Sequence, residues 1–254
     1  DEKAKVEPST ATRLFIIDGD DPLASFIEPN AQYERSIPTI TGNATDTGLG
    51  IIDTVEIALS TGSETRFWDG DSWETSGVPL WISVTQSLPN WQRNTGLPTF
   101  VDGETYEMQI RLTERSGEQY EFPGAGTTDF TVDVTSPTAA LEEPVTGGGV
   151  RTLTQITGTA DDPVPGLNES VQIAIRKFAA TSLWYDGSDF LVPGASPNWI
   201  NVVNGSSGTL SPNATSWTYA PVGMDNDFLG GFNYLFLVRS TDVAVNLQVT
   251  FGVG

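Results

Sequence analysis

Two stretches of the chain repeat each other and decide its fold: residues 38–59, PTITGNATDTGLGIIDTVEIAL, and residues 154–175, TQITGTADDPVPGLNESVQIAI. Ile40 of the shared Ile-Thr-Gly aligns with Ile156, an offset of 116 residues. Val55-x-Ile-Ala aligns with Val171-x-Ile-Ala at the same offset. Self-similarity over such a distance indicates a duplicated structural unit.

The repeat continues beyond these stretches. FWDGDSW at 67–73 matches WYDGSDF at 184–190, and Trp81 matches Trp199. Tyr106 and Arg111 match Tyr234 and Arg239, so the offset grows through small insertions in stretches rich in Gly, Ser, Pro and Asn. We therefore expect an N-terminal extension at 1–19 followed by two domains, 20–134 and 135–254. The short linker contains Pro137, which favours a stiff rod over loosely tethered domains.

Both repeats have the pattern of β-strands. Residues 54–59 and 106–112 alternate apolar and polar side chains, the period of a half-buried strand. Residues 234–238 are apolar throughout, which is typical of a strand covered on both faces. Asp69-Gly70 and Asp186-Gly187 stand between aromatic residues and predict tight type I′ hairpins, with the acids as turn residues rather than catalysts.

The order ITGxAxD, SVQIAI, WYDGSDF, an isolated Trp and Tyr-x4-Arg-Ser-Thr-Asp-x-Ala-x-Asn resembles bacterial Ig-like domains, most closely over residues 156–246. The first repeat departs at its last motif, where residues 113–117 are Thr-Glu-Arg-Ser-Gly. The resemblance implies an all-β chain of two tandem Ig-like β-sandwiches with an extra N-terminal strand. It also implies a secreted or cell-surface protein, and it carries no information about a ligand.

The composition excludes most enzyme classes. The 254 residues include no Cys and no His, so there is no Ser-His-Asp or Cys-His nucleophile and no tetrahedral zinc site. No spacing identifies a pair of acids facing each other across a cleft, so we expect no enzyme. Twelve basic against 33 acidic residues give a charge of −21, which argues against nucleic acid and anionic membrane surfaces and favours cations. No apolar run is long enough to insert in a membrane.

The N-terminal segment resembles a last strand. Residues 12–22 (TRLFIIDGDDP) align with residues 128–137 (TDFTVDVTSP), which should end the first domain. The segment is then the remnant of a longer array, the first strand of the first domain, or a strand donated to a neighbouring subunit. In the third case Leu14, Phe15, Ile16 and Ile17 carry the assembly.

Clustered carboxylates predict calcium, which takes six to eight oxygen ligands and tolerates irregular loops. Loops of tandem sandwiches meet at domain ends, so several acids should converge at the junction. The alternative is that they are turn residues that hydrogen-bond their own backbone. The predicted ligands are Asp20, Asp21, Asp46, Asp161, Asp162 and Asp242, with Asn246 close to the last of them.

Glycans are a further expectation. Asn204 and Asn213 are sequons in a stretch that reads as a loop, and a secreted chain is glycosylated at such positions. Trp68, Trp73, Trp91, Trp184 and Trp217 are expected to pack in the cores, although aromatic side chains also stack on sugars.

These observations predict a non-enzymatic extracellular structural protein. It would act as a spacer or as a self-assembling subunit of a cell-surface filament or layer, through strand donation by residues 12–18. Its expected partners are further copies of itself or neighbouring domains of a larger surface protein. The alternative is an adhesin or a carbohydrate-binding appendage of a larger secreted protein.

Overall fold

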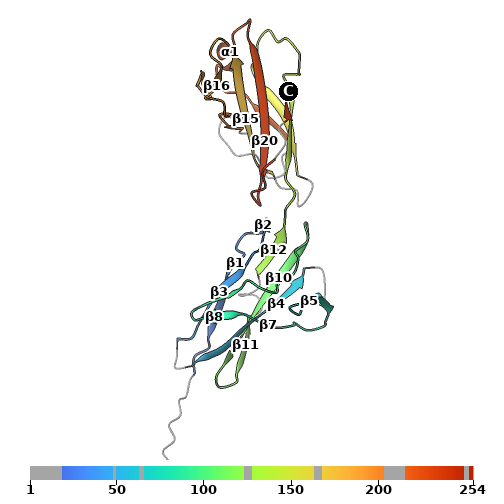
Figure 1. Ribbon diagram of the computed structural model, residues 1–254, viewed down its shortest axis with the longest axis vertical. Coiled ribbons are helices and arrows are strands. Elements are labelled where there is room, and N and C mark those ends of the chain that lie inside the picture. The colour runs from blue at the N-terminus through green and yellow to red at the C-terminus, as the bar shows by residue number, and fades with distance from the viewer. Residues whose placement is uncertain are drawn as a thin grey trace, which may run out of the picture.

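In the computed structural model the chain is all-β and forms two β-sandwiches that follow one another along the long axis of the molecule (Figure 1). The structure describes residues 19–47, 50–62, 66–122, 128–162, 168–202, 215–248 and 252–253. The predicted assembly residues and the two predicted glycosylation sites lie outside these ranges: Leu14, Phe15, Ile16, Ile17, Asn204 and Asn213.

The first sandwich packs a four-stranded sheet on an eight-stranded one. The smaller sheet has the order β1 (Leu23–Glu28), β3 (Ile40–Thr45), β9 (Asn90–Arg93) and β8 (Thr85–Ser87). The larger sheet has the order β2 (Tyr33–Glu34), β12 (Thr128–Val132), β10 (Thr105–Glu114), β4 (Ile52–Thr61), β5 (Arg66–Trp68) and β6 (Trp73–Thr75). Two further strands pair at its side, β11 (Gln119–Phe122) with β10 and β7 (Ile82–Ser83) with β4.

The second sandwich is built the same way from a three-stranded and a six-stranded sheet. The smaller sheet has the order β13 (Thr138–Glu143), β14 (Ile156–Asp161) and β19 (Ser216–Tyr219). The larger has the order β17 (Phe190–Val192), β16 (Leu183–Tyr185), β15 (Asn168–Phe178), β20 (Asn233–Asp242) and β21 (Gly252–Val253). To these are added β18 (Ile200–Val202), which pairs with β15, and the short helix α1 (Met224–Asp227).

The strand register repeats as the sequence alignment requires. In the first sandwich Glu56 of β4 lies opposite Arg111 of β10, and in the second Gln172 of β15 lies opposite Arg239 of β20. The irregularity between Phe26 and Glu28 in β1 likewise recurs at the matching place in β13. Because a slip of one residue would turn every side chain to the other face, this agreement means that the two sandwiches bury equivalent positions.

The buried apolar side chains of the described residues form two separate clusters, one in each sandwich. Ile57 and Ile110 in the first cluster, and Ile173 and Val238 in the second, are at most 1% exposed. Burying a side chain of this size stabilises the fold by roughly 1.5–3 kcal/mol. Each sandwich therefore carries its own hydrophobic core.

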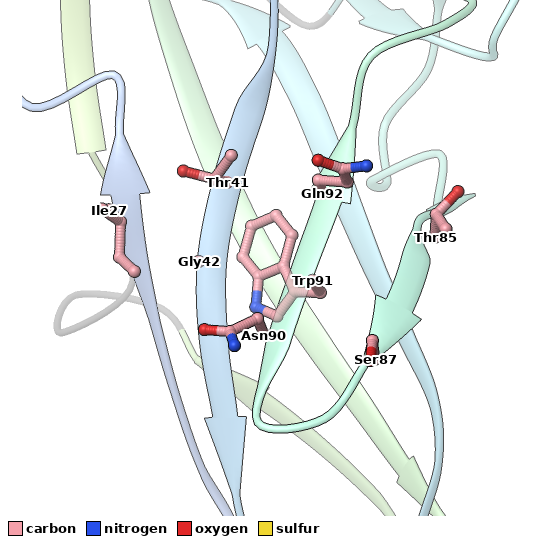
Figure 2. Close-up of a pocket in the computed structure, with 8 residues that line it drawn as sticks. All are labelled: Ile27, Thr41, Gly42, Thr85, Ser87, Asn90, Trp91 and Gln92. Atoms are coloured by element: carbon pink, nitrogen blue, oxygen red, sulfur yellow. The ribbon is translucent and has the colours of Figure 1, made fainter.

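A glycine beneath a tryptophan ring recurs in both cores. Gly42 of β3 lies beside Trp91 of β9, as Figure 2 shows, and Gly158 of β14 lies beside Trp217 of β19. A Cβ at Gly42 would meet the indole at 2.2 Å and the carbonyl oxygen of Ser25 at 2.1 Å. The Ile-Thr-Gly tripeptide is therefore a packing motif that leaves room for the ring.

The repeated Asp-Gly hairpins are present, but they are not type I′. Asp69 N donates to Ser72 O, so the two loop residues are Gly70 and Asp71, and only Gly70 has a positive φ, 108°. The Asp69 Oδ1 accepts hydrogen bonds from the backbone of Asp71 and Ser72, which lowers the pKa of this carboxyl. Asp186 does the same in the second sandwich. These acids hold turns, as predicted.

We expect Gly42→Ala to destabilise the first sandwich by about 3 kcal/mol or more, because the added methyl cannot avoid the Ser25 carbonyl and the Trp91 ring. Chemical denaturation followed by tryptophan fluorescence measures the change. Gly77→Ala is the matched control, since nothing lies within 4 Å of its Cβ position. Equal stability of the two variants would contradict the packing argument.

Candidate metal centre at the junction

Three aspartates form a buried cluster where the sandwiches meet. Asp133, Asp162 and Asp242 each offer a carboxylate oxygen, and these oxygens lie within 4.8 Å of one another. Asp133 and Asp242 are 0% exposed and Asp162 is 4% exposed. Acidic side chains are rarely this buried unless they are paired or bind a cation.

Asp133 comes from the first sandwich, directly after β12. Its backbone N donates to Glu34 O at 3.0 Å, which fixes it beside β2. Its carbonyl oxygen accepts a hydrogen bond from Asn246 Nδ2 at 2.7 Å, across the junction. The cluster is therefore assembled from both sandwiches, and the side chain of Asn246 joins them.

Asp162 and Asp242 come from the second sandwich, after β14 and at the end of β20. A tight loop follows Asp242, in which Asp242 N donates to Asn246 O and Asn246 N donates to Asp242 Oδ1 at 2.7 Å. Val245 takes a φ of 66° in this loop, a left-handed conformation that costs free energy for a β-branched residue. The loop accepts this strain and holds the Asp242 carboxylate in place.

Two contacts fix the linker beside the cluster. Asp102 Oδ1 accepts from Val134 N at 2.9 Å, and Asp102 Oδ2 accepts from the Thr135 hydroxyl. Arg35 of the first sandwich donates from Nη1 to Val245 O at 3.4 Å, a long bond across the junction. These contacts order the linker and the loop that carry Asp133 and Asp242.

The electrostatics of the cluster favour a cation. Burial and, to a smaller extent, the negative charges of Asp242 and Asp162 together raise the pKa of Asp133 to about 7. Within the described residues, the Oδ2 atoms of Asp133 and Asp242 accept no hydrogen bond. A buried carboxylate oxygen without a donor is costly, and a metal ion satisfies several such oxygens at once. The three carboxylates could therefore hold a metal ion.

No family model matches this chain, and no curated protein is similar to it in sequence.

Solved structures of β-sandwich modules do resemble it. The Clostridium thermocellum CbhA fibronectin(III)-like modules are 16% identical, with a TM-score of 0.39, over 91% of this chain and 91% of that one. The FN1-FN3 domains of chicken CNTN1 are 14% identical, with a TM-score of 0.35, over 88% of this chain and 65% of that one. A tetra-tandem repeat in the extending region of a large adhesion protein is 13% identical, with a TM-score of 0.31, over 93% of this chain and 49% of that one.

The structure brings together two of the six predicted ligands, Asp162 and Asp242. Asp161, the last residue of β14, is exposed, whereas Asp162, which directly follows the strand, is buried. The other three predicted ligands lie around the start of β1 and the end of β3, at the far end of the first sandwich (Figure 1), and do not contribute to the cluster: Asp20, Asp21 and Asp46.

Sequence reasoning missed Asp133. The feature of the sequence that could have identified Asp133 is its position at the end of a strand, directly before the predicted linker. Its hydrogen bond with Asn246 joins residues 113 positions apart, which no local pattern reveals.

A second candidate site, a hollow of about 440 Å³ on the four-stranded sheet, differs from the carboxylate cluster in its chemistry. Among the described residues, those that line it carry no carboxylate or basic side chain (Figure 2): Ile27, Thr41, Gly42, Thr85, Ser87, Asn90, Trp91 and Gln92. No helix in the described part of the chain is long and apolar enough to cross a membrane.

The metal-free protein should lose stability as the pH rises from about 4 to about 7. In this window Asp133 is protonated in the folded protein, where its pKa is raised to about 7, but ionised when unfolded, so folding takes up a proton. Melting temperatures in chelator at pH 5 and pH 8 measure the effect. Asp133→Asn should reduce the slope and the exposed Asp161→Asn should not; an unchanged slope in Asp133→Asn would contradict the assignment.

Proposed function

We propose that this chain is a non-enzymatic connecting element of an extracellular or cell-surface protein, serving as a spacer or as a subunit of a filament or layer. A calcium ion at the junction of its two sandwiches would hold them in line. One observation carries the proposal: a buried cluster of three carboxylates draws Asp133 from one sandwich and Asp162 and Asp242 from the other.

The donor set supports calcium over other metals. The chain has no Cys or His, so it lacks the thiolate and imidazole ligands that zinc and copper prefer. Calcium accepts carboxylate and carbonyl oxygens on irregular loops, and these ligands come from a linker, a strand end and a loop. Extracellular modules bind calcium with dissociation constants of about 10⁻⁴–10⁻³ M, which suits a secreted chain.

The position of the cluster supports a mechanical role. Each sandwich has its own core, so the ion is not needed to fold either of them. Within the described residues, the contacts across the junction include the hydrogen bonds of Arg35 and Asn246. An ion bound by both sandwiches would add several strong bonds to these and would restrict bending.

The buried tryptophans do not favour the carbohydrate-binding alternative. Trp68, Trp91, Trp184 and Trp217 are 8%, 2%, 2% and 1% exposed. The rings of Trp68, Trp91 and Trp217 belong to the core clusters, as predicted, whereas Trp184 is buried outside them with the Arg176 guanidinium 5.3 Å from its ring. Trp73 stacks on Tyr106 with a centroid distance of 5.7 Å.

Calcium should raise the melting temperature of the protein, and chelator should reverse the change. At a free calcium concentration 100 times the dissociation constant, binding stabilises the folded state by about 2.7 kcal/mol. Calorimetric titration and thermal melting measure binding and stability. Asp242→Asn should weaken binding at least tenfold, and it should stabilise the metal-free protein because it removes a buried charge.

Asp161→Asn is the matched control, since it makes the same change of charge at an exposed neighbour of Asp162. Small-angle X-ray scattering reports the mechanical effect: calcium should narrow the distribution of interdomain distances in the wild type and in Asp161→Asn, but not in Asp242→Asn. If calcium still narrows the distribution of interdomain distances in Asp242→Asn, the proposal is wrong.

A further inference from the structure

The outer faces of the two larger sheets are equivalent in structure but differ in charge. Ile110 of β10 lies opposite Ile57 of β4, and their counterparts Val238 and Ile173 lie opposite each other in the second sandwich. All four side chains belong to the cores. Because neighbouring side chains of a strand point to opposite faces, the residues beside them point outward, and each outward position has a counterpart in the other sandwich.

The outer face of the first sandwich is acidic. Glu107 of β10 lies directly opposite Asp129 of β12, and Arg111 lies opposite both Glu56 on β4 and Glu121 on β11. Arg111 forms its ion pair with Glu56. Like charges directly opposite each other destabilise a sheet, so the stability of the fold does not account for Glu107 beside Asp129. These five residues are the acidic face.

The outer face of the second sandwich has a different composition. Leu235 of β20 takes the place of Glu107, and Arg176, which lies opposite Leu235, takes the place of Ser60. Leu237 follows on the same face of β20, and both leucines are half-buried. A carboxylate and a hydroxyl are thus exchanged for an apolar side chain and a cation.

Two arginines on this face form no ion pair with any described residue. Arg176 lies over the Trp184 ring at 5.3 Å, and no described residue accepts a hydrogen bond from its buried Nε. Arg239 lies over the Trp199 ring at 4.2 Å and donates from Nε to the amide oxygen of Gln172 at 2.7 Å. Stacking on an aromatic ring holds the plane of a guanidinium in place, and its remaining N–H groups match a carboxylate. Both groups are therefore positioned to receive a carboxylate from outside the sandwich.

We propose that this basic face, formed by Arg176, Leu235, Leu237 and Arg239, docks on the acidic face of a second copy of this chain. Charge complementarity supports this partner, because the acidic face has three carboxylates beyond the one that pairs with its own arginine. Apolar side chains beside arginines are also typical of the centre of a protein interface. Each copy has one face of each kind, so the contact is heterologous.

The charges on the two faces are spaced alike. Arg176 and Arg239 stand four residues apart along the paired strands β15 and β20, which is about 13 Å. Glu121 stands four positions further along β10 than the opposed pair Glu107 and Asp129, again about 13 Å. When the two faces meet, one arginine can therefore approach the opposed pair while the other approaches Glu121.

Exchanging residues between the sandwiches removes the basic face without adding a side chain that the equivalent positions do not already hold. Arg176→Ser, Leu235→Glu and Leu237→Gln together give the second sandwich the residues of the first. By analytical ultracentrifugation, the wild type should form species larger than one chain of 27.2 kDa. This triple variant should associate at least tenfold more weakly.

Arg151→Ser combined with Val222→Glu is the matched control. It makes the same change in net charge at two exposed positions outside the basic face, so it should associate like the wild type.

The inference rests on the proposed connecting function and names its partner, and the two fail separately. None of the substitutions changes Asp133, Asp162 or Asp242, so calorimetry should give the same calcium binding for every variant and the wild type. Loss of the contact between copies leaves the calcium junction standing, and a chain that binds no calcium can still associate through these faces.

A mixture of two variants separates loss of the contact from misfolding. Glu107→Lys with Asp129→Lys removes the acidic face and keeps the basic one, so this variant alone should sediment as a single chain. Mixed with the triple variant, which keeps the acidic face, it should form complexes again, which a misfolded chain could not do. A wild type that sediments as a single chain, or a mixture that fails to associate, overturns the inference.

Discussion

Three carboxylates enclosed at one junction are the constraint on which the connection between the sandwiches depends. Taking an ionised carboxylate out of water costs several kcal/mol, and three together also repel one another. Without a metal ion, the raised pKa of Asp133 means that this carboxyl keeps a proton up to about pH 7. A divalent cation would balance the same charges without protonation, and under the function proposed above the alignment of the two sandwiches would then depend on the ion concentration around the molecule.

The fold itself does not depend on this cluster. The fold depends on the register of the strands and on the packing of a tryptophan ring over a glycine. Both features occur in each sandwich, although the surrounding side chains differ. Arg111 forms an ion pair with Glu56 at 2.6 Å, whereas Arg239 donates to the amide oxygen of Gln172 at 2.7 Å. Gly117 and Val245 occupy the same left-handed position in matching loops, although only glycine adopts it without strain. The shared backbone is thus maintained by the core, and surface pairs vary around it.

The fold can be predicted because the duplication is visible when the sequence is aligned with itself. Once residues 38–59 were aligned with 154–175, the alternation of apolar residues fixed which faces are buried, and the observed pairing of β4 with β10 and of β15 with β20 has that register. The site was harder to predict. Asp162 and Asp242 can be identified from composition near predicted loops, but the same criterion selects Asp161, which is exposed at the end of β14 although the next residue is buried. Asp133 enters the cluster through a contact between two domains, and such a contact leaves no periodic signal.

The linker changes what the junction has to achieve. It keeps the second sandwich at the end of the first, so the contacts between them only have to orient two parts that cannot diffuse apart. The hydrogen bonds of Arg35 and Asn246 cross this junction. The proposed ion at Asp133, Asp162 and Asp242 would act on the same two parts, so even a weakly bound ion would restrict their bending.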